Sequence, residues 1–285
     1  MQSKSSDRGM VVAKVIGGLG NQLFIYAAAK RLSVMNNVPL KLDVISGYIA
    51  YEYDHIYSLD HFQINAAKAT ERETHELNLG KRRNIGYHIN KVLPFGYKRY
   101  IKEEKLFDPR LLTLRVVNEI YLDGYWQNEI YFKDIESVIR HDLEIVTPHD
   151  PENIVLAEEI SAANSVCLHA RRIKYEHLLS ARYYELAIQH MASKVRNPHF
   201  FCFADDMEWV RRNLPMDWPI TYITHNPRSK DYEDLWLMKR CKHFIIANST
   251  FSWWGAWLNA DPDKIVIAPR DWGYRAAVPK EWVVL

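Results

Sequence analysis

The chain has little cysteine, and what it has is scattered. Its 285 residues include three cysteines, Cys167, Cys202 and Cys241, each flanked by apolar residues. An odd number at wide spacing excludes a disulfide framework and a closely spaced cysteine metal site. The pattern indicates buried, reduced thiols, so we expect a reducing compartment.

Long apolar runs and an excess of one charge are also lacking. No run approaches the roughly 20 residues of a membrane-spanning helix, and residues 1–9 are too polar for a signal peptide. Lys and Arg number 37 against 35 Asp and Glu, which predicts no nucleic-acid partner. Repeats and low-complexity segments are absent. We therefore expect a soluble, cytoplasmic globular protein.

Short apolar strands alternate with helices along most of the chain, which predicts the α/β class with parallel sheets. The expected strands are residues 10–16, 39–43, 165–169, 199–204, 220–224, 243–247 and 264–268, and residues 119–124 form a strand-like run into a turn. The expected helices are residues 21–36, 181–194, 207–214, 232–241 and 253–258. Turn residues at Thr147–Pro151 predict a boundary between a first domain, 10–150, and a second, 151–285.

A glycine-rich segment, Gly17-Gly18-Leu19-Gly20-Asn21-Gln22, lies between the first strand and the first helix. Such glycines let backbone N–H groups approach a phosphate or a sugar diphosphate. A dinucleotide site is one alternative, with Asp43 near the place of the ribose-binding acid, but Leu23 replaces the third glycine of that fingerprint. A strand-to-helix turn without a ligand is the other alternative.

Two adjacent arginines, Arg171 and Arg172, follow His169 at the end of a predicted strand. A guanidinium matches phosphate oxygens with two hydrogen bonds. Held in place, it stabilises the charge on a leaving nucleoside diphosphate and can replace a metal ion. Because side chains alternate along an extended chain, we expect Arg171 to face the phosphate and Arg172 to point away. The alternative is a surface pair bridged to carboxylates.

A polar segment, Asn248 to Gly255, joins another predicted strand to a helix. Its hydroxyls and the N-terminal amides of the helix can form an anion site, and helix capping is a compatible alternative. The candidate ligand-binding residues are Asn248, Ser249, Thr250 and Ser252. The tryptophans that follow are expected to pack in the core rather than bind sugar.

Three acidic side chains come next. Asp205 and Asp206 suggest a metal-binding acidic pair, but Asp206 is more simply the N-cap of the next helix. Asp234 lies at the start of a helix, and its carboxylate can accept from both N1–H and N2–H of guanine. The alternative for Asp234 is an ordinary first-turn acid.

Basic residues are concentrated between Gly80 and Lys105, where eight Lys and Arg face two Glu. A solvated surface is one interpretation. The other is a patch that contacts anionic lipid head groups or a phosphorylated acceptor.

Together these motifs resemble the α-1,2-fucosyltransferase family, glycosyltransferase family 11, over roughly residues 10–270. The matching segments are Gly17–Phe24, Gly124–Gln127, His169–Arg172, Phe203–Asp206, Glu233–Met238 and Ile245–Ala256. The last is long and nearly unbroken, so its specificity is high.

The resemblance implies a GT-B architecture, two Rossmann-like domains facing a cleft, with an N-terminal acceptor side and a C-terminal GDP-sugar side. It implies transfer of L-fucose from the co-substrate GDP-β-L-fucose to a galactoside hydroxyl, with inversion to an α-1,2 linkage and with no metal or cofactor. The acceptor is an oligosaccharide or lipid-linked surface glycan, so peripheral contact at the inner face of the cytoplasmic membrane is expected.

The resemblance also implies roles for single residues. Arg171 contacts the β-phosphate, Asn21 lies near the donor sugar, and Asp234 contacts guanine. Further donor-binding candidates are Gly18, Gly20, Gln22, His169, Arg172, Asn248, Ser249, Thr250 and Ser252. No spacing singles out a catalytic base among Asp43, Asp54, His55 and Asp123.

One departure concerns the family pattern H-x-R-R-G-D-Y, in which Ile173 and Lys174 replace the Gly and Asp. The charge beside the donor is therefore reversed in sign. This leaves two other functions open: a transferase that uses another GDP-sugar, and a non-catalytic glycan- or nucleotide-binding module.

Overall fold

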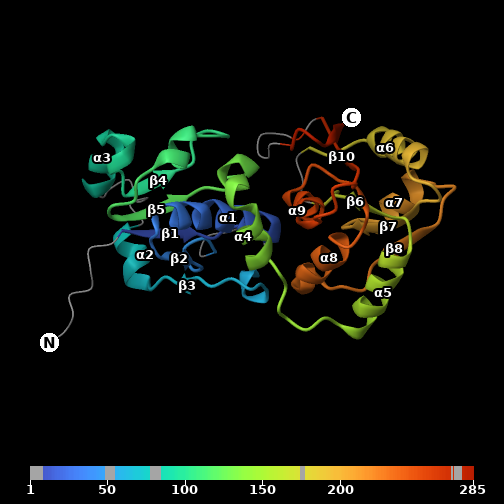
Figure 1. The fold of residues 1–285 in the computed structure, drawn as a ribbon, viewed down its shortest axis with the longest axis horizontal. Helices are drawn as coiled ribbons and strands as arrows, with labels where there is room; N and C mark the ends of the chain where they lie inside the picture. Colours follow the sequence, from blue (N-terminus) through green and yellow to red (C-terminus); the bar gives the residue numbers. More distant parts are fainter. Residues whose placement is uncertain (1–8, 49–54, 78–84, 174–176, 271, 273–277) are drawn as a thin grey trace. The chain divides into compact units, whose positions relative to one another are not determined.

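The chain forms two compact units in the computed structural model (Figure 1), one ending at Glu144 and the other spanning Ile145–Leu285. The structure describes residues 9–48, 55–77, 85–173, 177–270, 272 and 278–285. Asp54, Lys174 and residues 80–84 of the predicted basic stretch lie outside these ranges. Each unit has its own parallel sheet.

The N-terminal unit contains a five-stranded sheet in the order β3-β2-β1-β5-β4, with every neighbouring pair parallel. Its strands are β1 (Met10–Lys14), β2 (Leu40–Asp43), β3 (Ala67–Lys68), β4 (Tyr100–Lys102) and β5 (Glu119–Asp123). Its α-helices are α1 (Leu19–Asn36), α2 (Glu71–Leu77), α3 (Ile85–Val92) and α4 (Glu136–Asp142).

Helix α1 is the central helix of this unit. It follows the glycine-rich turn, packs on β1, and buries apolar residues around most of its circumference. It ends where Asn37 adopts a left-handed conformation that Asn tolerates better than most residues. The turn before α1 is therefore fixed between a buried strand and a buried helix.

The C-terminal unit contains a six-stranded parallel sheet in the order β11-β10-β9-β6-β7-β8. Its strands are β6 (Ser165–Ala170), β7 (His199–Ala204), β8 (Ile220–Ile223), β9 (His243–Ile245), β10 (Val266–Ala268) and β11 (Val283–Val284). Its α-helices are α5 (Pro151–Ala162), α6 (Ala181–Lys194), α7 (Met207–Asn213), α8 (Asp231–Met238) and α9 (Thr250–Leu258).

Each sheet has one point where the strand order reverses. In the C-terminal unit the chain runs from β6 outward to β7 and β8, then continues at β9 on the other side of β6. In the N-terminal unit the reversal lies between β1 and β5. In open parallel sheets, ligands bind at the carboxyl ends of the strands beside such a switch point.

The predicted α/β class with parallel sheets is confirmed. The three cysteines are buried and free, and the tryptophans of α9 pack against one another in the core, as expected. The first strand ends at Lys14 rather than residue 16, because the chain already turns toward the glycine-rich segment. Sequence patterns missed the short strands β3, β4 and β11. Within the described ranges, no helix has the length and apolarity needed to cross a membrane.

Candidate functional site

The switch point of the C-terminal unit brings two predicted motifs together. Strands β6 and β9 are neighbours, with Leu168 paired to Ile245. Arg171 and Asn248 each lie three residues beyond this pair, past the carboxyl ends of β6 and β9, so they lie beside each other at one edge of the sheet. The arginine motif and the hydroxyl-rich motif therefore meet at this edge.

Asp205, directly after β7, fixes the backbone of the arginine motif. Its carboxylate accepts from the backbone N–H of Arg172 at 2.7 Å and of Ile173 at 2.9 Å. The same carboxylate lies 3.2 Å from the Arg171 guanidinium. Arg171 is thereby held in one orientation while its side chain stays 31% exposed, open to a ligand.

Arg172 is engaged in a different way. Its guanidinium lies 3.8 Å from the centre of the Trp209 ring and donates to the carbonyl of Leu179 at 2.6 Å. These contacts assign Arg172 to packing of the loop. They give no support to its predicted donor-binding role, and they match the expectation that the two arginines point in different directions.

His169 is buried at the end of β6. Burial and the nearby Arg171 charge lower the pKa of its imidazole to about 3, so the ring is neutral at physiological pH. Its Nδ1 atom is buried and has no hydrogen-bond partner in the described part of the chain. With a neutral ring here, the positive charge of the motif comes from its two arginines, of which Arg171 is held beside Asp205.

Helix α9 begins at the same edge of the sheet. Ser249 occupies the N-cap position but makes no side-chain cap hydrogen bond, and the Ser252 hydroxyl donates to the Ser249 carbonyl. The Asn248 amide donates to the carbonyl of His177 at 2.8 Å. Together with Thr250, these residues place the positive end of the α9 dipole beside the Arg171 motif.

Asp234 lies in the first turn of α8, on a polar network. Asn226, after β8, donates to its Oδ1 atom at 2.7 Å, and the buried Asn153 of α5 donates to Asn226 at 2.8 Å. Burial raises the pKa of Asp234 to about 6. Burial and the Asp234 charge likewise raise the pKa of Asp231 to about 7. Burial disfavours the charged form of Asp234, so this carboxylate is a candidate for accepting hydrogen bonds from a ligand.

In the N-terminal unit, the glycine-rich turn is held by its own side chains. Gly17 has φ +82°, a left-handed conformation that favours glycine. Gln22 is fully buried; it donates to the carbonyls of Gly17 and Ile56 and accepts from Ser58 N–H. Its amide thus holds the turn, and the structure gives no support to its predicted donor-binding role. Gly20 is buried in the first turn of α1.

Asn21 faces the loop that follows β5. Its Oδ1 atom accepts from Gln127 Nε2 at 2.8 Å. The glycine-rich turn and the Gly124–Gln127 segment, both singled out in the sequence, therefore meet at the switch point of this unit.

The candidate bases occupy different environments. The Asp43 carboxylate is buried and accepts from the N–H groups of Ile45 and Ser46. Asp123 is bonded to the Tyr100 hydroxyl and lies 3.3 Å from Lys14 Nζ. The imidazole of His55 packs against Gly18, where an added Cβ would lie 3.3 Å from it. Of the described candidates, only His55 contacts the glycine-rich turn.

The acidic pair is not arranged as a metal site. Asp206 caps α7 by accepting from Trp209 N–H at 2.9 Å, as expected. The Asp205 oxygens are engaged by the arginine loop. Across the described ranges, no cluster of three or more His, Cys, Asp or Glu side chains has a geometry suited to a metal ion.

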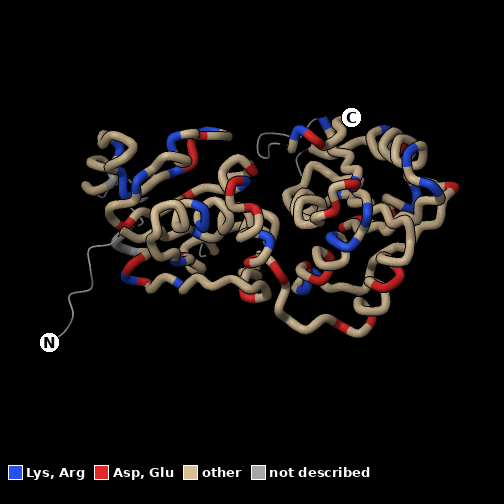
Figure 2. Tube along the Cα trace, in the orientation of Figure 1, with Lys and Arg blue, Asp and Glu red and all other residues tan. Residues whose placement is uncertain are grey.

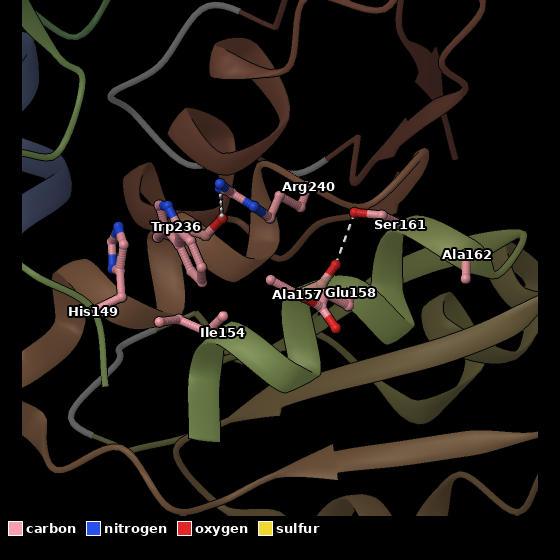
Figure 3. A pocket seen from close by; sticks show the side chains of 8 residues that line it. All are labelled: His149, Ile154, Ala157, Glu158, Ser161, Ala162, Trp236 and Arg240. Atoms are coloured by element: carbon pink, nitrogen blue, oxygen red, sulfur yellow. Dashed lines mark hydrogen bonds between the residues drawn. The ribbon is translucent and has the colours of Figure 1, made fainter. Parts of the chain in front are cut away.

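A surface groove of about 640 Å³ lies between α5 and α8 (Figure 3). The His149 ring stacks on the Trp236 ring with their centres 3.6 Å apart, and the Arg240 guanidinium lies 3.7 Å from the centre of the Trp236 ring. The groove is lined by His149, Ile154, Ala157, Glu158, Ser161, Ala162, Trp236 and Arg240. None of the predicted site residues lines it, so it is separate from the site described here.

Sequence reasoning missed three residues that organise the site. Asp205 was considered for a metal, while Glu103 and Asn226 were not considered. All three are polar residues just beyond a strand of a parallel sheet, and this position was the signal: Asp205 and Glu103 directly follow β7 and β4, and Asn226 comes shortly after β8.

Two Rossmann-like parallel-sheet units, with polar motifs at their switch points, define a GT-B-type glycosyltransferase. The chain belongs to glycosyl transferase family 11, whose family model matches residues 10–284. The predicted family and fold are therefore confirmed.

Related proteins and structures agree with this class. The chain is 33% identical to an Escherichia coli alpha-1,2-colitosyltransferase, covering 96% of this chain and 98% of that protein. It is 23% identical to galactoside alpha-(1,2)-fucosyltransferase 2 of Hylobates lar, covering 92% of this chain and 72% of that protein. The structure of NodZ alpha-1,6-fucosyltransferase soaked with GDP-fucose has the same fold, with a TM-score of 0.56 at 13% identity over 88% of this chain and 92% of that one.

Proposed function

We propose that the protein transfers L-fucose from GDP-β-L-fucose to a galactoside hydroxyl, forming an α-1,2 linkage with inversion. The observation that carries the proposal is Arg171, a partly exposed guanidinium braced by Asp205 at the switch point of the C-terminal unit. The fucosyltransferase relatives support the donor, and the similarity to an alpha-(1,2)-fucosyltransferase supports the linkage.

The role of Arg171 follows from the charge that develops in the reaction. As the bond from the sugar to GDP breaks, its electron pair moves onto the β-phosphate oxygen. A guanidinium that is already oriented stabilises this charge with little reorganisation. The α9 N-terminus, with Asn248, Ser249, Thr250 and Ser252, adds a positive dipole toward the same anion. We propose that these groups make both a metal ion and an organic cofactor unnecessary.

Asp234 is proposed to bind the guanine base. With Oδ1 fixed by Asn226, the carboxylate is oriented to accept from guanine N1–H and N2–H. Adenine presents no such pair of donors, so this contact would select GDP over ADP. In the N-terminal unit, Gly18, Gly20 and Asn21 are proposed to lie near the sugar.

A second candidate is transfer of colitose from its GDP-activated form. The 33% identity to a colitosyltransferase favours it, and the replacement of the family's Gly and Asp by Ile173 and Lys174 leaves the choice of donor sugar open. Ile173 is 48% exposed, so it is available to contact a donor or an acceptor.

A donor and acceptor screen tests the proposal. GDP release is measured with GDP-fucose, GDP-colitose and GDP-mannose on galactoside acceptors, and the product linkage is determined by NMR. We expect transfer from GDP-fucose and an α-1,2 linkage. Preference for GDP-colitose would favour the second candidate, and GDP binding without turnover of any donor would indicate a non-catalytic binding module.

The protein is further proposed to act on a lipid-linked glycan at the inner face of the cytoplasmic membrane. Helix α3 exposes Ile85, Ile89 and Val92 at 78%, 53% and 81%, which are positions on one helical face. Lys91 lies on α3, Lys98 follows it, and Lys102 ends β4; Figure 2 shows basic residues along this part of the chain. An exposed apolar face beside lysines fits a surface of anionic lipid.

Liposome flotation tests this contact. Anionic vesicles are expected to carry the protein at low salt and to release it at high salt. A variant with Ile85, Ile89 and Val92 changed to Ser should bind more weakly. Equal binding of this variant, or absence of binding by the wild type, would leave α3 as an ordinary solvated helix.

A further inference from the structure

Three neighbouring strands of the N-terminal unit end at one edge of its sheet. Strand β5 lies between β1 and β4, and all three run parallel. The residues that follow them are therefore brought together, although more than 80 positions of sequence separate Asn21 from Glu103. They are Asn21 after β1, Glu103 after β4, and Tyr125, Trp126 and Gln127 after β5.

Glu103 clamps the backbone of the loop after β5. Its carboxylate accepts from Tyr125 N–H at 2.7 Å and from Trp126 N–H at 3.0 Å. Gly124 makes this approach possible, because a Cβ added there would lie 2.3 Å from the Glu103 Cβ. The carboxylate thus fixes two consecutive peptide groups just before Gln127.

The clamped segment is strained. Trp126 has φ +55°, a left-handed conformation that is costly for a bulky side chain. Strain of this kind is kept where the surrounding structure enforces it, often at functional sites. Here it turns the chain so that Gln127 reaches back to Asn21 at 2.8 Å.

Gln127 has one amide atom in use and one without a partner. Its side chain is 3% exposed, and Nε2 donates to Asn21 Oδ1. The Oε1 atom is buried and has no hydrogen-bond partner among the described residues. The neighbouring Trp126 Nε1 has none there either. An unpartnered buried amide oxygen is expensive, so such a group in a native protein calls for a ligand or an ordered water.

We propose that Gln127 is a sugar-binding residue, whose Oε1 atom accepts a hydrogen bond from a sugar hydroxyl, and that Glu103 is its positioning residue. This inference rests on the proposed function, because it requires a glycosyl substrate. The hydroxyl belongs to the donor sugar or to the acceptor glycan, and both present the same chemistry. By donating to Asn21 Oδ1, Gln127 also fixes the Asn21 amide so that its N–H₂ group faces the Gly17 turn.

The test substitutes Gln127→Met, which keeps the length of the side chain and removes both polar groups. Calorimetry measures the affinities for GDP and for GDP-fucose, and initial rates give the KM for the acceptor. If Oε1 binds the donor sugar, the advantage of GDP-fucose over GDP falls on the order of tenfold while GDP affinity is unchanged. If Oε1 binds the acceptor, the acceptor KM rises by a similar factor and both nucleotide affinities stay constant.

Gln63→Met is the matched control, since Gln63 is exposed and its side chain bonds His141 at the surface. It should leave all three quantities unchanged. Gln127→Ala removes the same amide without adding volume or charge; it should change the same quantity as Gln127→Met, and it serves if Gln127→Met fails to fold.

Glu103→Gln tests the positioning role. A single amide oxygen replaces two carboxylate oxygens, so one of the two N–H groups loses its acceptor. Glu103→Gln should therefore affect the same quantity as Gln127→Met, either the advantage of GDP-fucose over GDP or the acceptor KM. We expect a change of about two- to fivefold in the same direction, with GDP affinity unchanged. Glu119→Gln, on β5 of the same sheet and paired at the surface with Arg99, is the control and should behave as the wild type.

Wild-type values in Gln127→Met, or an equal loss of GDP and GDP-fucose affinity together with lowered thermal stability, would overturn the inference. A wild-type chain that binds GDP-fucose no better than GDP and transfers no sugar would instead refute the proposed function, and the inference with it.

Discussion

The two units place different chemistry at equivalent points of similar sheets. At the switch point of the C-terminal unit lie a guanidinium, a helix N-terminus and, further along the sheet edge, a carboxylate of raised pKa. At that of the N-terminal unit lie glycine backbone and the amides of Asn21 and Gln127. Charged groups suit a diphosphate and a purine, whereas neutral amides suit sugar hydroxyls. The same fold therefore supports a division of labour between the units.

The two units also keep their site residues at different costs. In the C-terminal unit the cost is electrostatic, since burial raises the pKa of Asp231 and Asp234. In the N-terminal unit the cost is conformational, since Trp126 is held at positive φ by the Glu103 clamp. The electrostatic cost is of the type that the proposed ligand would relieve, because guanine N–H groups would donate to the Asp234 carboxylate, whereas the backbone strain at Trp126 is held by Glu103 within the protein.

The largest expected effect comes from Arg171→Ala. Removing a preorganised donor to the leaving diphosphate should lower kcat by on the order of 10²–10³. Arg171→Lys should stay strongly impaired, because an ammonium lacks the two-pronged geometry. Arg172→Ala, which removes a packing contact with Trp209, should lower kcat less. Initial rates with folded variants, checked by circular dichroism, test this order, and near-normal turnover of Arg171→Ala would refute the diphosphate assignment.

Asp205→Asn should have the next largest effect. The amide keeps one acceptor oxygen but loses the charge beside Arg171 and one of the two backbone contacts to residues 172 and 173. Hydrogen bonds to charged groups contribute about 1.5–3 kcal/mol, so kcat/KM should fall roughly 10- to 100-fold. Asp217→Asn, at an exposed position of the same unit, is the control. Equal rates for the two variants would show that Asp205 does not orient Arg171.

A smaller, base-specific effect is expected for Asp234→Ala. The affinity for GDP should fall about tenfold, and the difference between the affinities for GDP and ADP should narrow, as measured by calorimetry. Unchanged GDP affinity would reduce Asp234 to a first-turn helix acid.

The raised pKa of Asp234 adds a pH dependence. Because its pKa is about 6, the carboxylate is ionised at pH 7.5 and becomes protonated as the pH falls through 6. GDP affinity should therefore decline below pH 6 in the wild type. Asp231, Glu233 and His225 also interact electrostatically with this region. Asp234→Asn removes only the contribution of Asp234, so a decline of equal size in that variant would assign the pH dependence to these neighbours.

No effect is expected from chelation. Arg171 and the α9 N-terminus supply positive charge, and both carboxylates of the acidic pair are engaged within the protein. Activity should survive EDTA at millimolar concentration. Loss of activity with rescue by Mn²⁺ or Mg²⁺ would restore Asp205 and Asp206 as a metal site.

The sequence was sufficient to predict the α/β class with parallel sheets, because short strands alternate with helices, although the short strands β3, β4 and β11 were missed. Strand alternation predicted different roles for Arg171 and Arg172, and the two side chains have different partners, Asp205 and Trp209. The roles of Asp205 and Glu103 did not follow, because each acts on the loop of a neighbouring strand, and strand order is a tertiary property. Gln22 was predicted to bind the donor because it belongs to the glycine-rich motif. Its position on α1 instead directs its amide to the carbonyls of Gly17 and Ile56 inside the protein.

The division of labour between the units is tested most directly by calorimetry with GDP and GDP-fucose on two variants, Arg171→Ala and Asn21→Ala. Arg171→Ala should weaken the binding of both ligands by similar factors, because both carry the diphosphate. Asn21→Ala should leave GDP affinity unchanged and remove the advantage of GDP-fucose over GDP. Equal losses of GDP affinity in the two variants, or unchanged GDP affinity in Arg171→Ala, would contradict the account.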